Sequence, residues 1–413
     1  MAPEHKKTQC CIAGGGPAGV MLGYLLARAG VDVIVLEKHV DFFRDFRGDT
    51  VHPSTLEVMN ELGLLEKFRQ LPHQKVEKLG ATIGKDKLYL AEFSHLKNAA
   101  PYIAFVPQWD FLNFLTAEAK KFSNFQILMG AEAFDLRVVD DEVAGLYAKT
   151  STGIIEIEAD LTVGADGRGS AIRECAGLEV EEQGVPIDVL WFSVPRDPKD
   201  GDETEAKILP GSILIMINRD SYWQCAFVIG KGELALLKEQ GLAHFRRQIM
   251  YSSGFTAERL EVLDDWEKIR LLTVKIDYLK QWHHKGLLCI GDAAHAMSPV
   301  GGVGINLAIQ DAVAAANLLY GAFNSGAVES ADLSAIERRR RWPTRATQFM
   351  QRNAHERILN RVLETEGKIV PPWILKKLAN WPTFRRFVGG LIGNGLRPEH
   401  VDEGIIDAEK PCH

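Results

Sequence analysis

The chain has 413 residues, of which 46% are hydrophobic and 25% charged, and its formal net charge is −7. At about 150 residues per domain, this length allows two or three ordinary globular domains. The composition excludes a wholly disordered chain, and six cysteines are too few for a small disulfide scaffold. The acidic balance argues against a nucleic-acid partner, which normally selects a basic surface.

The cysteines and the apolar runs indicate the cellular compartment of the protein. The adjacent Cys10 and Cys11 lie in a strand-like run, where their side chains would face opposite sides, and no two cysteines form a C-x-x-C pair. We therefore expect buried thiols in a reducing compartment. No uncharged apolar run reaches the ~18 residues of a membrane span, and the polar segment Met1–Thr8 lacks the apolar core of a signal peptide. The expectation is a cytoplasmic protein with no integral membrane span.

A glycine-rich motif follows the first expected strand. Gln9–Ala13 is a short apolar run, and Gly14–Gly19 then fits the pattern G-x-G-x-x-G. A helical pattern follows, and the β-branched run Val31–Leu36 comes next. This order is that of a dinucleotide-binding unit, in which the first glycine permits a tight turn. The second, Gly16, lets the backbone approach a pyrophosphate, and the third, Gly19, lets the helix pack closely on the strand.

An acidic residue ends this unit. Glu37 stands 21 residues after Gly16, where a carboxylate reaches the ribose hydroxyls of an adenosine and repels a 2′-phosphate. The site therefore favours FAD or NAD over NADP. The alternative for Glu37 is a solvated acid at the end of a strand.

Two later motifs extend the pattern. Val163–Gly167 ends an apolar strand with Asp166 and Gly167, and Leu287–Asp292 is a second such strand ending in Gly-Asp. A glycine-rich loop follows the second motif and leads into a helical pattern from Leu307 to about Tyr320. Glycine-rich backbone at a helix N-terminus is an anion or dipole site.

With these three motifs in this order, the chain resembles the single-component flavoprotein aromatic hydroxylases, the p-hydroxybenzoate hydroxylase-like family of FAD monooxygenases. The resemblance covers roughly residues 9–320, with a similar ending at Gly395–His400. It implies FAD as cofactor, NADH or NADPH as co-substrate, and O₂. There is no complete second glycine fingerprint, since Ile172 replaces its last glycine, which argues against flavoproteins with two Rossmann domains.

The resemblance also implies roles for single residues. Asp292 would bond the ribityl chain of FAD, and backbone N–H groups near Gly304 would face the flavin pyrimidine. Asp166 matches a motif linked to both FAD and the nicotinamide donor. The expected cofactor-binding residues are Gly14, Gly16, Pro17, Ala18, Gly19, Glu37, Lys38, Arg47, Gln108, Asp166, Asp292, Gly302, Gly304, Ile305 and Asn306. The expected catalytic residues are Pro299 and His295, with a structural hydrogen bond as the alternative for His295, and no metal site is expected.

The reaction implied is hydroxylation of an electron-rich, aromatic small molecule. NADH or NADPH would reduce the flavin, and reduced flavin with O₂ would give a C4a-hydroperoxide that transfers one oxygen atom. One alternative is an FAD-dependent reductase or dehydrogenase of the same fold. Another is a non-catalytic flavin-binding protein that holds a ligand.

The expected fold is α/β, with a Rossmann-like FAD-binding domain, an inserted and mainly antiparallel β-sheet domain for substrate, and a C-terminal helical segment. The FAD-binding domain is expected to be discontinuous, and the oligomeric state to be a monomer or homodimer. The expected boundaries are 1–71, 106–180 and 279–340 for FAD, 72–105 and 181–278 for substrate, and 341–413 for the helical cap.

Some segments in these domains allow more than one interpretation. Trp191, Tyr222, Trp223 and Phe227 belong to alternating, strand-like runs and either line a substrate pocket or fill the core of the sheet. The charge run Glu337–Arg341 is expected to be a solvated helix face, with docking of an acidic partner or a membrane surface as the alternative. The segment from Ile358 to Phe387 is expected to form an amphipathic cap on the FAD-binding domain, with contact to a membrane surface as the alternative.

Overall fold

The computed structural model describes residues 4–43, 50–356, 360–363, 365, 367 and 369–408. Its main sheet has eight strands in the order β19-β20-β11-β1-β2-β8, and β10 and β9 extend it from β11. The strands are β1 (Glu4–Ala13), β2 (Val33–Glu37), β8 (Phe125–Met129), β9 (Glu132–Val139), β10 (Glu142–Thr150), β11 (Gly153–Gly164), β19 (His283–His284) and β20 (Leu287–Cys289). β20, β11, β1, β2 and β8 are parallel, so their carboxyl ends meet at one edge.

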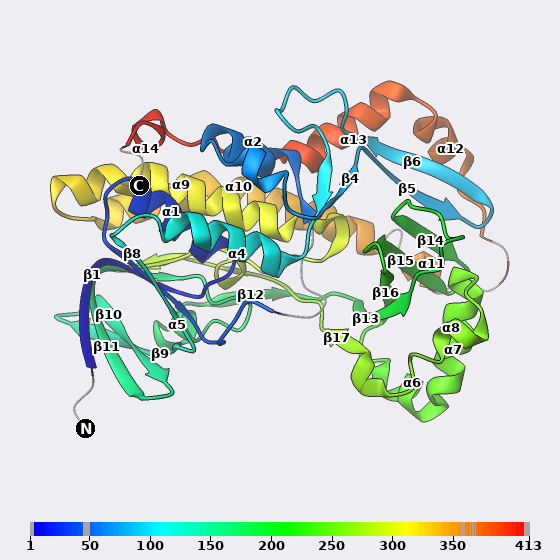
Figure 1. Cartoon of the computed structure of the whole chain (residues 1–413), viewed down its shortest axis with the longest axis horizontal. Coiled ribbons are helices and arrows are strands. Elements are labelled where there is room, and N and C mark those ends of the chain that lie inside the picture. Colours follow the sequence, from blue (N-terminus) through cyan, green and yellow to red (C-terminus); the bar gives the residue numbers. More distant parts are fainter. Residues whose placement is uncertain are drawn as a thin grey trace.

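Four helices cover one face of this sheet. They are α1 (Pro17–Arg28), α4 (Gln108–Ala119), α9 (Gly304–Ser325) and α10 (Ser330–Ala354). Their apolar faces form one core with the strands, and Cys10 belongs to it. Cys11 belongs to a second core on the opposite face, so the prediction that the two thiols face opposite sides is confirmed. Figure 1 shows α9 and α10 running across the molecule above this sheet.

The second sheet joins two segments that are far apart in the sequence. Its seven strands lie in the order β17-β13-β16-β15-β14-β5-β6. They are β5 (Lys78–Ile83), β6 (Asp86–Glu92), β13 (Ile187–Pro195), β14 (Glu205–Leu209), β15 (Ser212–Asn218), β16 (Tyr222–Gly230) and β17 (Arg270–Leu272). β14 pairs with β5 in parallel, and the remaining pairs are antiparallel. The α/β fold with an inserted, mainly antiparallel sheet is therefore confirmed.

Short elements connect and cover the two sheets. One face of the second sheet packs on α6 (Leu234–Gln240), α7 (Leu242–Ser253) and α8 (Ala257–Leu260). Two small sheets are formed by β3 (Thr50–Val51), β7 (Ile103–Phe105) and β4 (Gln74–Val76), and by β12 (Val180–Gln183) and β18 (Ile276–Leu279). The other short helices are α2 (Pro53–Glu61), α3 (Leu65–Phe68), α5 (Ala171–Cys175), α11 (Asn360–Leu363) and α14 (Glu403–Ile406), with 3-10 turns at Trp266–Lys268, Gly291–Ala293 and Val300–Gly302.

The C-terminal segment differs from its expectation. α12 (Trp373–Ala379) and α13 (Pro382–Asn394) pack on strand β6 of the second sheet, as Figure 1 shows, rather than on the main sheet. The cap expected on the FAD-binding domain thus lies mainly on the second sheet, where Gly389 lets α13 approach the backbone of Glu92 closely, and α13 also contacts α2. α10 also continues through the domain boundary expected at residues 340 and 341.

One helix among the described residues is long and apolar enough to cross a membrane, the segment Val300–Ser325, which contains α9. Most of it is buried inside the protein, where it packs against α1 and α10. It also carries Asp311, which is fully buried and paired. These features are those of a core helix.

Candidate active site

The glycine turn between β1 and α1 is as tight as its sequence predicts. Gly14 has a φ of +107°, and a Cβ there would lie 2.3 Å from the carbonyl oxygen of Ala165. A Cβ at Gly19 would lie 1.9 Å from the carbonyl oxygen of Gly14. At Gly16, in contrast, a Cβ would meet no described atom within 4 Å. The backbone at Gly16 therefore has room for a ligand beside it.

The start of α1 offers amide groups next to that space. Gly16 is the N-cap residue, Pro17 occupies the first turn, and none of the described side chains caps the helix. The N–H groups of Ala18 and Gly19 belong to this uncapped turn. Because a helix N-terminus carries partial positive charge, the turn is suited to a phosphate group.

Glu37 lies at the carboxyl end of β2, beside the same turn. Its Oε2 accepts a hydrogen bond of 3.2 Å from the N–H of Gly15, and its Oε1 accepts one of 3.0 Å from the N–H of His39. These contacts hold the carboxylate at the turn. Lys38 is exposed to solvent.

Asp166 and Asp292 follow neighbouring parallel strands, β11 and β20, and lie on the same edge. The Oδ2 of Asp166 accepts a hydrogen bond of 3.2 Å from the N–H of Ile172, while its Oδ1 is buried and has no hydrogen-bond partner among the described atoms. Burial raises the pKa of the Asp166 carboxyl above its ordinary value. Asp292 forms a half-buried ion pair with Arg168, with 3.2 Å between Nη2 and Oδ2. The prediction did not include Arg168 as a site residue, although it directly follows Asp166-Gly167.

The loop before α9 requires glycine at two consecutive positions. Gly301 and Gly302 have φ angles of +82° and +63°, which other residues rarely adopt. A Cβ at Gly302 would lie 2.3 Å from the Oγ1 of Thr50, and that hydroxyl donates a hydrogen bond of 2.7 Å to the carbonyl of Gly302. The loop is thus held against β3 by this contact and this hydrogen bond.

The side chain of Asn306 bonds to neighbouring residues, whereas its backbone N–H lies in the first turn of α9. Its Oδ1 accepts hydrogen bonds of 2.8 Å each from the N–H of His52 and the hydroxyl of Thr55. Its Nδ2 donates to the carbonyls of Thr50 and Gly302. The side chain is therefore fully engaged in holding the loop, and its backbone N–H remains for a ligand.

The start of α9 resembles the start of α1. α9 begins at Gly304, and no side chain in the described ranges caps it, so the amides of Gly304, Ile305 and Asn306 form a second uncapped helix turn. The two helix starts flank the Gly291 turn. A Cβ at Gly291 would lie 3.1 Å from the Cβ of Ala18 in α1 and 3.3 Å from that of Ala308 in α9.

A buried polar stripe on α10 holds the segment between the Gly291 turn and α9. The Nε2 of Gln351 donates to the carbonyls of Ser298 and Val300, and its Oε1 accepts from the N–H of Ser298. The hydroxyl of Ser298 contacts the Nε2 of His355 at 2.7 Å. Pro299 lies within this clamped segment and is half-buried. The structure therefore fixes the Pro299 backbone from both sides.

His295 is directed away from solvent. Its side chain is 1% exposed, its Nε2 lies 2.5 Å from the Oδ2 of Asp311, and the ring of Trp282 packs against it at a tilt, with 4.9 Å between centroids. Arg340 contacts the other oxygen of Asp311 at 2.9 Å and Glu399 at 3.2 Å. Burial alone would raise the pKa of Asp311, but His295 and Arg340 hold it below its ordinary value. Of the two roles considered for His295, this geometry supports the structural hydrogen bond.

The charge run on α10 also differs from its expectation. Glu337 is 7% exposed and Arg340 is fully buried, so the interpretation of Glu337–Arg341 as a solvated face is wrong for these two side chains. They share one side of the helix with Gln348 and Gln351, at the spacing of about 3.6 residues per turn. This periodicity of polar residues was the signal in the sequence that could have identified the stripe.

The remaining predicted cofactor residues lie around the same edge. Gln108 begins α4 and is half-buried, and the ring of the following Trp109 lies 5.1 Å from that of Phe43. Arg47 lies outside the described residues.

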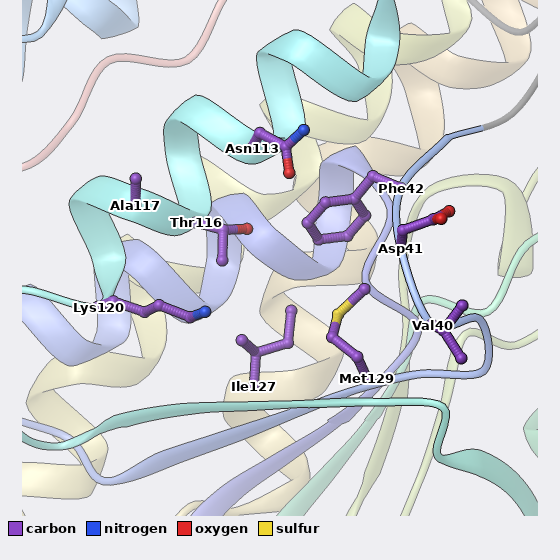
Figure 2. Close-up of a pocket in the computed structure, with 9 residues that line it drawn as sticks. All are labelled: Val40, Asp41, Phe42, Asn113, Thr116, Ala117, Lys120, Ile127 and Met129. Atoms are coloured by element: carbon purple, nitrogen blue, oxygen red, sulfur yellow. The ribbon is translucent and has the colours of Figure 1, made fainter.

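The main sheet also borders a small cavity of about 280 Å³ between α4 and β8, seen in Figure 2. Phe42 points into it from the loop after β2, and Thr116 faces it from α4. Its full lining is Val40, Asp41, Phe42, Asn113, Thr116, Ala117, Lys120, Ile127 and Met129. None of these residues comes from the second sheet, so this cavity does not belong to the sheet domain expected to bind substrate.

The four aromatic candidates of the second sheet divide between its two faces. Trp223 and Phe227 are each 4% exposed and belong to the core under α7, which confirms the core interpretation for both. Trp191 packs on the opposite face, together with Phe105 of β7. β7 pairs with β3, whose Thr50 holds Gly302, so the face that carries Trp191 is the one nearer to the loop before α9. Tyr222 is half-buried at the start of β16.

These features together fit an elongated dinucleotide such as FAD. Two uncapped helix starts suit a pyrophosphate and the electron-rich edge of a ring, and the buried Oδ1 of Asp166 still requires a donor. Glu37 and Asp292 supply carboxylates on the same edge.

Comparison with known proteins identifies the family. A family model described as "FAD binding domain" matches residues 7–350. The 6-methylpretetramide 4-monooxygenase of Streptomyces rimosus is 30% identical over 354 residues, which cover 83% of either chain. The rifampicin monooxygenase of Streptomyces venezuelae is 28% identical over 310 residues, 73% of this chain and 61% of that one. The crystal structure of p-nitrophenol 4-monooxygenase from Pseudomonas putida matches 95% of this chain and 100% of its own with a TM-score of 0.77 and 18% identity, which shows the shared fold.

Proposed function

Because the chain belongs to the FAD-dependent aromatic monooxygenases of the p-hydroxybenzoate hydroxylase-like family, we propose that it hydroxylates an electron-rich aromatic compound, with NADH or NADPH and O₂ as co-substrates. The observation that carries this proposal is the pair of uncapped helix starts on either side of the Gly291–Asp292 turn. Bound FAD would supply hydride acceptance and oxygen activation.

The residues of this edge would hold the cofactor from end to end. The amides of Ala18 and Gly19 would bind the pyrophosphate, and Glu37 would accept from the ribose hydroxyls. Asp292 would bond the ribityl chain, and the first amides of α9 would stabilise negative charge on the pyrimidine edge of the reduced ring. The Thr50 and Asn306 side chains would fix the α9 loop, so that these amides keep their positions.

The two expected catalytic residues take different parts in this proposal. Pro299 lies in the loop that leads to α9, where it would line the flavin ring. Gln351 would keep it in place by its hydrogen bonds to the backbone on either side. His295 would act as a positioning residue through Asp311, since its ring is buried and Asp311 bonds the Gly291 backbone.

The substrate would meet the flavin on the side of the second sheet that carries Trp191. This face is apolar, with Ile215, Ile217 and Phe105 beside Trp191. An apolar wall excludes water and favours a flat, aromatic molecule. The names of relatives that act on tetracycline-type and phenolic compounds suggest which compounds to test first.

The test separates the three functions considered. Purified protein, reconstituted with FAD, is supplied with NADH or NADPH and a panel of phenolic, quinonoid and polycyclic compounds. Substrate-dependent O₂ consumption together with a product heavier by one oxygen atom is the expected result. Product formation without O₂ would indicate a reductase, and FAD binding with no turnover of any compound would indicate a ligand-binding protein.

A further inference from the structure

α12 and α13 carry large apolar side chains that face solvent. Trp373 is 72% exposed, Phe387 70%, Trp381 57% and Ile374 52%. Apolar residues gathered in this way mark interaction sites on soluble proteins. These four residues, with the exposed Lys377 and Arg386, are called here the α12–α13 surface.

Both helices pack one side on β6 and leave their other sides to solvent. The buried Ala379 of α12 belongs to a core with Leu88 of that strand. In α13, a Cβ at Gly389 would lie 2.0 Å from the carbonyl oxygen of Glu92, so this side of the helix touches the strand directly. The exposed side chains of both helices therefore lie on the sides that face away from β6. Figure 1 shows the two helices at its upper right, next to β6.

The charges of this segment are unlike those of the whole chain. Residues 369–398 include five lysines and arginines and no acidic residue, in a chain with a net charge of −7. Packing accounts for two of the cations. Lys376 pairs with Asp86 at 2.8 Å, and Arg385 pairs with Glu92 at 3.3 Å, both on the side of β6.

The outward cations are different. Neither Lys377 nor Arg386 forms an ion pair with any carboxylate in the described part of the chain. They stand on the exposed sides of α12 and α13, among the exposed aromatic rings. Two unpaired cations beside tryptophan and phenylalanine side chains form a pattern that packing within this protein does not explain.

We propose that the α12–α13 surface docks on a bilayer that contains anionic lipid. The aromatic and aliphatic side chains would enter the boundary between headgroups and acyl chains, where tryptophan is favoured. Lys377 and Arg386 would meet lipid phosphates, and each cation near such a surface strengthens binding about fivefold. A symmetric contact between two copies of the chain is less suitable, because it would bring these cations toward their own counterparts.

The test is co-sedimentation of the full-length, FAD-loaded protein with vesicles of phosphatidylcholine, with and without phosphatidylglycerol. We expect binding to the anionic vesicles only, weakened by added salt. The double variant Trp373→Ser/Phe387→Ser and the double variant Lys377→Glu/Arg386→Glu should each lower the binding constant at least tenfold. The matched control is Trp342→Ser/Phe349→Ser on α10, whose side chains are also largely exposed, at 60% and 59%, and which should bind as the wild type does.

Two further measurements establish that the variants are folded and that the surface does not instead pair two copies of the chain. FAD content and the rate of NAD(P)H oxidation in solution should be unchanged in all three variants, which shows that they are folded. Equal sedimentation of the wild type and the Trp373→Ser/Phe387→Ser variant would overturn the proposal. So would light scattering that shows a wild-type dimer and a monomeric variant, since the surface would then be an interface between two copies.

Discussion

The Nε2 of His295 lies 2.5 Å from the Oδ2 of Asp311, and neither side chain is more than 1% exposed. The same oxygen accepts a hydrogen bond of 3.1 Å from the N–H of Gly291, the residue before Asp292. Arg340 contacts the second oxygen and extends the network to Glu399 near the C-terminus. The turn that presents Asp292 is thus held by buried charged side chains of α9 and α10, and not by Asp292 itself.

Replacing Arg340 with methionine tests this network. The substitution keeps much of the volume but leaves Asp311 and Glu399 buried without the cation they share. Breaking a buried pair in this way costs about 3–5 kcal/mol of the free energy of unfolding. We expect Arg340→Met to unfold at a clearly lower denaturant concentration and to bind FAD more weakly, as measured by fluorescence titration.

The control for this variant is Arg338→Met on the same helix. Arg338 is exposed and contacts only Ser334 among the described residues, so its loss should change stability by less than about 1 kcal/mol. Similar unfolding curves for the two variants would show that the buried network does not stabilise the fold.

Asp292→Ala should weaken FAD binding. The variant removes a charge-assisted hydrogen bond to the proposed ribityl chain, worth about 1.5–3 kcal/mol, or roughly ten- to hundredfold in affinity. Since the side chain of Asp292 is 32% exposed, the lower part of this range is expected. Titration of the apoprotein with FAD measures the effect, with the exposed Glu174→Ala as control. An unchanged dissociation constant would remove Asp292 from the cofactor site.

Gly302→Ala should displace the loop before α9 and lower FAD affinity, whereas a glycine substitution with the same backbone strain but no steric clash should not. The matched control is Gly326→Ala at the end of α9, which also has a positive φ but meets no described atom within 4 Å of the added Cβ. Both variants carry the backbone strain, and only the first displaces Thr50. We expect Gly302→Ala alone to lower FAD affinity and NAD(P)H oxidation. Equal losses in both would attribute the effect to backbone strain.

The sequence predicted the parts of the site whose chemistry lies in contiguous motifs. Gly14–Gly19, Glu37 and Asp292 occupy the same sheet edge, because each follows or precedes a strand whose pattern is readable. The inserted sheet was predictable for the same reason, since its strands alternate or are uniformly apolar. The local sequence pattern was sufficient to predict those features in which residues close in sequence lie together in the fold.

The buried interactions that hold the site in place could not be predicted in this way. Arg340 and Asp311 meet across 29 residues, and Glu399 joins them from 59 residues further on, so no local window includes all three. Four arginines in a row indicate a solvated face on average, and although the polar periodicity of α10 marks Arg340 as part of a stripe, it does not identify Asp311 and Glu399 as its partners. The local sequence pattern also could not predict where α13 packs, because that position depends on the contact between Gly389 and the backbone of Glu92.

His52 should make the stability of the α9 loop depend on pH. The side chain is 1% exposed, and its Nδ1 lies 2.9 Å from the carbonyl oxygen of Ile392 in α13, while its backbone N–H donates to Asn306. Burial lowers the pKa of His52 to about 4, from an ordinary value of 6.5, although nearby backbone carbonyls oppose the shift. The folded protein therefore holds this ring neutral at pH values where the unfolded chain binds a proton.

The direction of the effect follows from that difference. Between about pH 4 and 6.5 the unfolded chain binds more protons at this residue, so its contribution to stability falls as the pH falls, by at most about 1.4 kcal/mol per pH unit. Unfolding midpoints of the wild type and of His52→Gln, measured from pH 7 to pH 4.5, should converge or cross on acidification, because the variant lacks this group. The exposed His284→Gln serves as control for the loss of a histidine from the surface. A constant offset for His52→Gln would mean that burial does not lower the pKa of His52 and that this residue gives the stability no such pH dependence.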